Sequence, residues 1–327
     1  MAWITDLKEQ LLIVSVQNFS CLVCVAVYVN LENHECYHVW TGKSIISTLK
    51  AVCTKFPSAL AYEFKQEVKK LHLGLSGSFE VLCWEGLGIE PYVFIKQDIL
   101  HGIHKFVWDH PGEWLMNLLG ASELDQHFIV QPPLHFQHFT GGVLKISQAS
   151  GREHHTYQKS ILPVIVGHAN VDNKVINVTQ SILDFTYMAQ YPSLSEMDLE
   201  KMDNILSIFH QNKDIFLSSG AHKSTHFQIP KLHGLQHFVG DVHSGRPPDN
   251  FTTETPKSLH INMCKEPYNA SNHCEYDTQI LNYLGIHDHL AMQQAYEAYQ
   301  VRMNTQLNSV STNPGFEHPT WPQNFTY

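Results

Sequence analysis

The chain has 327 residues, 43% of them apolar, so it is long enough to bury one large hydrophobic core or two smaller ones. Its 21 lysines and arginines stand against 31 aspartates and glutamates, and the resulting net charge of -10 excludes a strongly basic nucleic-acid-binding protein. Only 16% of residues are charged, and the 23 histidines supply polar side chains that titrate near neutral pH.

Neither a membrane span nor an export signal is predicted. The longest apolar run, from Cys21 to Val29, is far shorter than the roughly 20 residues that cross a bilayer. The first residues mix acidic and apolar side chains and lack a basic region followed by an apolar stretch. Seven scattered cysteines do not indicate a disulfide framework. We therefore expect a nuclear or cytoplasmic protein that is not secreted.

The first part of the chain, residues 1–95, is predicted to hold the strands. β-Branched residues are frequent over 11–16, and valines alternate with smaller residues over 22–29. A chain that opens directly into a strand suggests that earlier strands of a longer domain are missing. The predicted sheet would then be incomplete, and its exposed edge would favour self-association.

A zinc site is predicted within the same region. Cys21-x-x-Cys24, followed by His34-x-x-x-His38, has the ligand types and local spacings of a tetrahedral zinc site. Cys36 is a competing ligand, and the alternating valines favour the alternative that the cysteines are only strand interior. The histidine-rich stretch 226–237 lies beside Phe and Leu residues and is interpreted as packed interior.

Residues 96–301 are predicted to be mainly helical. Apolar residues recur every three to four positions in two segments, Ile99 to Val107 and Val175 to Phe185. Ser193 and Glu196 form a predicted capping box for a helix that runs towards Phe216 and is ended by Asn212-Lys213 and Gly220. Pro230 is placed where a new helix begins. The segment 302–327 has no apolar period and is predicted to be a disordered tail.

Several blocks of this helical region resemble a known family. They read Asp98-Ile-Leu-His101-Gly-Ile-His104-Lys105, Trp108-Asp109-His110, Leu119-Gly-Ala-Ser-Glu-Leu-Asp125, Gly151-Arg-Glu-His154, Leu183-Asp-Phe-Thr-Tyr187 and the block from His226 to His233. In order and spacing, across about residues 1–300, they are similar to Plavaka-type transposases of basidiomycete fungi. The resemblance implies an RNase H-like core with an Asp-Asp-Glu triad that holds two Mg²⁺ ions for DNA cleavage and strand transfer at transposon ends.

The resemblance also assigns candidate catalytic residues. Asp98 matches the second carboxylate, with His101 and His104 in supporting roles. The third carboxylate is expected at Glu254, or at the position that here is Lys257, where a lysine would repel the metal ions. The first aspartate is expected upstream of the matched part. We do not assign it to Asp6, although that residue lies in an early segment that also resembles the family.

Together these observations predict an α+β, mostly α protein with a partial RNase H-like core. It is expected to be a degenerate, transposable-element-derived chain that resembles the C-terminal part of an Asp-Asp-Glu transposase, has lost its Mg²⁺ and does not cleave DNA. The alternative is a domesticated, non-enzymatic module that binds DNA or protein.

Overall fold

The structure is a computed structural model that describes residues 4–56, 61–70, 74–76, 82–132, 139–146, 149–244 and 251–310. It divides into two compact units, residues 1–254 and 255–327. No helix in the described part of the chain is long and apolar enough to cross a membrane.

The structure is 66% helical, and the residues it describes form no β-strand. In place of a sheet they contain three isolated antiparallel bridges: Val16 with Leu75, Ser20 with Val27, and Cys24 with Val39. The predicted α+β fold with a partial RNase H-like core is therefore wrong. Self-association through a sheet edge loses its basis, because the described residues offer no such edge.

The first predicted strand is a helix, α1 (Leu7–Val14). Asp6 caps it by accepting a hydrogen bond from the backbone N–H of Glu9 at 3.1 Å, and Ser15 ends it in the left-handed conformation at φ 62°. Leu11 and Val14 face the interior from this helix. A good N-cap and two buried side chains at helical spacing thus outweigh the β-propensity of the run.

The second predicted strand shows real alternation, but the opposite face is buried. Cys24 and Ala26 are fully buried, whereas Val25 is exposed. The chain then turns into a short 3-10 helix, η1 (Tyr28–Glu32), instead of pairing along its length. The valine pattern therefore indicated a two-faced extended segment, and the small residues form its inner face.

The remaining helices of the first unit are mostly short. They are α2 (Gly42–Lys55), α3 (Ala61–Lys70), α4 (Pro91–Phe94), η2 (Ile99–His104), α5 (Lys105–Val107), η3 (Trp108–Gly112), α6 (Glu113–Leu119), α7 (Ala121–Ile129), α8 (Gly151–Ile165), α9 (Asn173–Met188), α10 (Glu196–Asn212), α11 (Ile215–Ser218), α12 (Pro230–Leu235) and α13 (Phe238–His243). Both η2 and η3 are π-helical, with a wider turn than an α-helix.

The helical predictions for this region are largely confirmed. Ile103, Phe106, Val178 and Ile182 are buried at the predicted spacing. Helix α10 ends at Asn212, short of the predicted run towards Phe216, and its cap is Ser195, which forms the capping box with Asp198 two residues later than expected. Pro230 is the first residue of α12.

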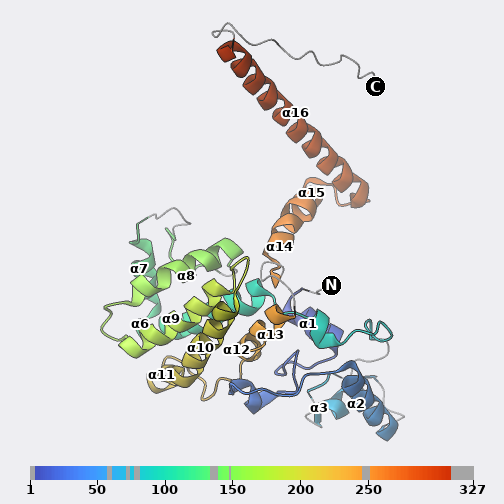
Figure 1. Ribbon diagram of the computed structural model, residues 1–327, viewed down its shortest axis with the longest axis vertical. Coiled ribbons are helices and arrows are strands. Elements are labelled where there is room, and N and C mark those ends of the chain that lie inside the picture. Colours follow the sequence, from blue (N-terminus) through green and yellow to red (C-terminus); the bar gives the residue numbers. More distant parts are fainter. Residues whose placement is uncertain are drawn as a thin grey trace. The chain divides into compact units, whose positions relative to one another are not determined.

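The hydrophobic core of the first unit falls into separate clusters along the chain. One lies within Leu11–Ile95 and includes Trp40, Ile45 and Trp84. The largest lies within Ile99–Phe251, where helices α6 to α10 contact one another in chain order (Figure 1). A small third cluster contains Cys21, Cys24, Ala26 and Leu31. Along the chain, the first of the two large clusters ends at Ile95 and the second begins at Ile99, so Asp98 lies between them.

The second unit contains α15 (Glu266–Ala270) and a long helix, α16 (Tyr276–Val310), together with most of α14 (Glu254–His260) and a π-helical turn, η5 (Ile261–Lys265). Helix α16 continues past residue 301, so it includes the first part of the segment predicted as a disordered tail. The rest of that segment, 311–327, lies outside the described residues.

Candidate metal centre and the buried Asp98 carboxylate

A tight turn presents Cys21 and Cys24 on the same side of the chain. The Cys21 sulfur accepts hydrogen bonds from the backbone N–H groups of Val23 at 3.3 Å and Cys24 at 3.4 Å. Trp40 Nε1 donates to the Cys21 carbonyl at 3.2 Å and so holds the turn against the following segment. Both cysteines are buried. The turn therefore supplies two sulfur ligands in a fixed geometry.

Two histidines from α12 and the start of α13 face these sulfurs. His233 Nε2 lies 3.2 Å from the Cys24 sulfur, and His237 Nε2 lies 3.2 Å from the Cys21 sulfur. Pro230 fixes the start of α12 at a point that places His233 in the helix and His237 four residues later, directly before α13. His233 is completely buried.

The four ligand atoms lie within 4.8 Å of one another, and this cluster could hold a metal ion such as Zn²⁺. It contains both predicted cysteines but neither predicted histidine. The His34 ring stacks on His210 with 4.7 Å between centroids, and the His38 carbonyl accepts from the Val25 N–H. Cys36, the competing ligand, is exposed. The second pair of ligands thus comes from a segment some two hundred residues away.

The environment of the two thiols is asymmetric. A hydrogen bond with Cys21, together with those from His233 and His237, lowers the pKa of Cys24 to about 3 against the effect of burial. Burial raises the pKa of Cys21. Cys24 is therefore the more readily deprotonated of the two thiols.

Asp98 is the N-cap of η2, and its carboxylate is buried at 2% exposure. Oδ1 accepts from the backbone N–H of Leu100 at 3.2 Å and of Thr253 at 2.7 Å. Oδ2 accepts from the His101 N–H at 3.0 Å, from Thr253 Oγ1 at 2.7 Å and from the His101 ring. Burial alone would raise the pKa of Asp98, but the hydrogen bonds from His101 and Thr253 outweigh it and lower the pKa.

Glu254, the other candidate catalytic carboxylate, directly follows Thr253, whose N–H and hydroxyl donate to Asp98. His155 Nε2 lies 3.2 Å from Glu254 Oε2, and this hydrogen bond lowers the pKa of Glu254. The His155 ring also lies against that of His104, with 4.3 Å between centroids. Burial lowers the pKa of His104 to about 4, and its Nδ1 lies 2.8 Å from Gln158 Oε1.

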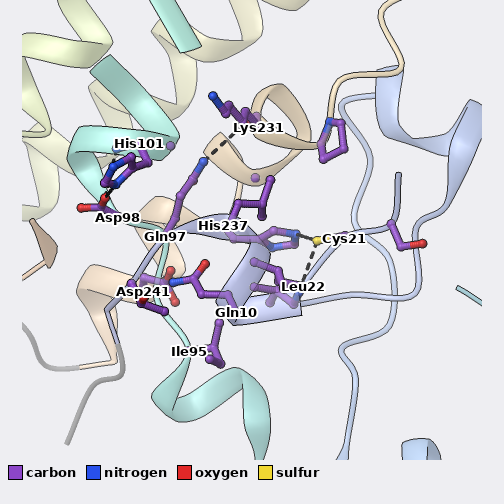
Figure 2. Close-up of a pocket in the computed structure, with 17 residues that line it drawn as sticks. Gln10, Cys21, Leu22, Ile95, Gln97, Asp98, His101, Lys231, His237 and Asp241 are labelled. Carbon is purple, nitrogen blue, oxygen red and sulfur yellow. Dashed lines mark hydrogen bonds and ion pairs between the residues drawn. The ribbon is translucent and has the colours of Figure 1, made fainter. Parts of the chain in front are cut away.

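A small cavity of about 50 Å³ separates the metal-capable cluster from Asp98. Figure 2 shows Cys21 and His237 facing each other on one side, Asp98 and His101 on the other, and Gln97 between them. Gln97 Nε2 donates to the Lys231 carbonyl at 3.3 Å. A Cβ on Gly102 would come within 2.5 Å of Gln97 Cγ and one on Gly234 within 2.8 Å of Gln97 Nε2, so a larger residue at either position would displace the Gln97 side chain.

Sequence reasoning missed His233, His237 and Thr253. The spacing His-x-x-x-His at 233–237 is the same as at 34–38, and both are metal-ligand spacings. Proximity in the chain favoured His34 and His38, whereas the structure places His233 and His237 beside the two sulfurs. Nothing in the sequence marked Thr253 as the partner of Asp98.

The fold and the site thus define a helical protein with a Cys₂His₂ cluster and a buried, capped carboxylate. Residues 1–115 match a family model described as Plavaka transposase. The matched segment contains Cys21, Cys24 and Asp98, whereas their partners in 230–254 lie outside it, and it is shorter than the resemblance over about residues 1–300. Neither the curated proteins nor the solved structures yielded a match.

Proposed function

We propose that this chain derives from a Plavaka-type transposase of basidiomycete fungi and that it binds its partner without cleaving DNA. The match over residues 1–115 supports the descent. The observation that carries the loss of cleavage is the state of Asp98, the best candidate for a triad carboxylate.

The Asp98 carboxylate has no free position for a metal ion. Two carboxylate oxygens offer about four lone-pair directions, and five donors already point at them. Mg²⁺ requires an oxygen ligand in near-octahedral geometry and gives up its own waters reluctantly. Coordination by Asp98 would break the bonds to Thr253 and to the start of η2. In this arrangement the carboxylate is a structural group.

The second candidate carboxylate is also engaged. Glu254 is paired with His155, and Lys257 follows it one turn later in α14, where the resemblance implies a glutamate. Two divalent ions held about 3.5–4 Å apart need several carboxylates around them. A lysine in this position opposes that charge balance.

The remaining activity is binding, and DNA is the partner that the family suggests. With a net charge of -10, the chain offers no broad basic surface, so binding would depend on local contacts. Because this negative charge disfavours DNA binding, the alternative is that the partner is a protein.

The test uses the purified full chain with supercoiled plasmid and an end-labelled duplex, each with Mg²⁺ or Mn²⁺. We expect no nicked or shortened product above the level of Asp98→Ala prepared in parallel, which controls for contaminating nuclease. Metal-dependent cleavage that both Asp98→Ala and Glu254→Gln abolish would overturn the proposal. Fluorescence anisotropy on the same duplex at low salt then decides between DNA and a protein partner.

A further inference from the structure

We propose that Cys21, Cys24, His233 and His237 bind one Zn²⁺ ion as a closed structural site. The inference does not depend on descent from a transposase or on DNA cleavage. It rests on the positions of four side chains, their burial and the hydrogen bonds that fix the cysteine turn.

The distances fit zinc with little rearrangement. Zinc bonds of about 2.3 Å to sulfur and 2.0–2.1 Å to nitrogen, at tetrahedral angles, separate a sulfur from a nitrogen by about 3.5 Å. The two sulfur–nitrogen distances are 3.2 Å, and all four ligand atoms lie within 4.8 Å of one another. The two hydrogen-bonded sulfur–nitrogen pairs therefore need shifts of only a few tenths of an ångström, and the more distant pairs need to close by up to about 1 Å.

The cysteine turn is held by hydrogen bonds before any metal binds. Two backbone N–H groups, those of Val23 and Cys24, point at the Cys21 sulfur. Such donors stabilise the negative charge that a cysteine sulfur carries when it binds a metal ion, and an apolar side chain in place of Cys21 would leave them without an acceptor. The bridges of Ser20 with Val27 and of Cys24 with Val39 hold the turn at both ends.

The histidines present the nitrogen that a metal requires. Both approach the sulfurs through Nε2, which leaves Nδ1 to carry the proton when the ring is neutral. The side-chain Nε2 of Gln236 lies 2.9 Å from His233 Nδ1 and 2.7 Å from His233 Nε2. Zinc binding through His233 Nε2 therefore requires the Gln236 amide to move away from that nitrogen, and its contact near Nδ1 can then orient the ring.

The ligand set selects zinc and a structural role. Two thiolates and two imidazoles suit Zn²⁺, whereas Mg²⁺ and Ca²⁺ need oxygen ligands. Four protein ligands leave no open coordination position for a substrate. Cys24 and His233 are completely buried, and 209 residues separate them in the chain. The ion would therefore join the segment around η1 to α12 and α13 within the first unit.

The first experiment measures metal in the untagged full chain by mass spectrometry after dialysis. We expect one zinc per chain, lost in Cys21→Ser and in His237→Asn. The matched controls are His34→Asn, His38→Asn and Cys36→Ser, which change the same residue types outside the cluster and should keep one zinc. Zinc lost equally from the controls, or absent from the wild type even after addition of Zn²⁺, would overturn the proposal. In the latter case the cluster would be a set of thiol–imidazole hydrogen bonds.

The second experiment does not require any variant to fold. X-ray absorption at the zinc edge of the wild-type protein should show two sulfur ligands at about 2.3 Å and two nitrogen ligands at about 2.0–2.1 Å. A first shell of oxygen and nitrogen only would show that zinc is bound elsewhere. Neither result bears on DNA cleavage, so this proposal and the proposed function can fail separately.

Discussion

Replacement of Asp98 by alanine tests whether this carboxylate holds the structure together or is kept free for catalysis. The change removes the cap of η2, for which loss of an Asp N-cap costs about 1 kcal/mol. It also leaves the Thr253 N–H and hydroxyl without their acceptor in a buried position. Each hydrogen bond to a charged group contributes about 1.5–3 kcal/mol, so together with the cap we expect a total loss of about 4–7 kcal/mol in the free energy of unfolding.

The assay is urea unfolding followed by circular dichroism of the helices. Asp172→Ala is the matched control, because Asp172 caps α9 through one exposed hydrogen bond to the Lys174 N–H at 2.7 Å. It should cost only about 1 kcal/mol. Thr253→Val separates the hydroxyl contribution, and combined with Asp98→Ala it should cost little more than Asp98→Ala alone.

The reasoning is refuted if Asp98→Ala unfolds at the same urea concentration as Asp172→Ala, or at a higher one. A carboxylate kept for metal binding often destabilises the fold, so its removal would be neutral or stabilising. That outcome would return Asp98 to the role of a catalytic ligand.

Two further predictions concern other buried charged or titratable groups. Lys96 and Asp241 form a buried ion pair at 2.6 Å. Asp241→Asn should lower the free energy of unfolding in urea by about 3–5 kcal/mol. The double variant Lys96→Met with Asp241→Leu should recover most of this loss. Equal effects of Asp241→Asn and of the exposed-pair control Lys70→Met would contradict it. His104, with its pKa lowered by burial to about 4, is neutral when folded, so the unfolded chain takes up the proton first as the pH falls. The contribution of this residue to the free energy of unfolding should be complete above about pH 6.5. It should fall by about 1.4 kcal/mol per pH unit as the pH drops towards about 4. Unfolding curves of His104→Asn should therefore show a shallower pH dependence than those of the wild type.

The helical part of the fold could be predicted because its signals are local. In α9, Val178 and Ile182 recur at helical spacing and are buried, and Pro230 marks the start of α12. The strand prediction for the N-terminal part was wrong because β-branched residues fit both a helix such as α1 and an extended segment. There the cap at Asp6 and burial of Leu11 decide the structure, and the second of these depends on the rest of the fold.

Only the two cysteines of the metal-capable cluster could be predicted, because their histidine partners depend on the rest of the fold. Cys21 and Cys24 are neighbours in the chain, and their spacing alone indicates a common turn. Their partners depend on which of several histidine pairs the folded chain brings to that turn. His34 and His38 are close in sequence, yet the structure brings His233 and His237 to the sulfurs instead.

The segment from 230 to 254 completes both features of the matched region. Helix α12 contacts η1 and η2, so its position sets the distance of His233 from Cys24 as well as the packing of Gly234 against Gln97. Thr253, at the other end of the segment, supplies two of the five donors to Asp98. Residues 1–115 therefore contain the two sulfurs and the carboxylate, but the nitrogen ligands and the main buried partner of that carboxylate come from outside the match. A fragment limited to the matched residues would take two of its five donors from the Asp98 carboxylate and both imidazoles from the two cysteines. We therefore expect such a fragment to be less stable than the full chain.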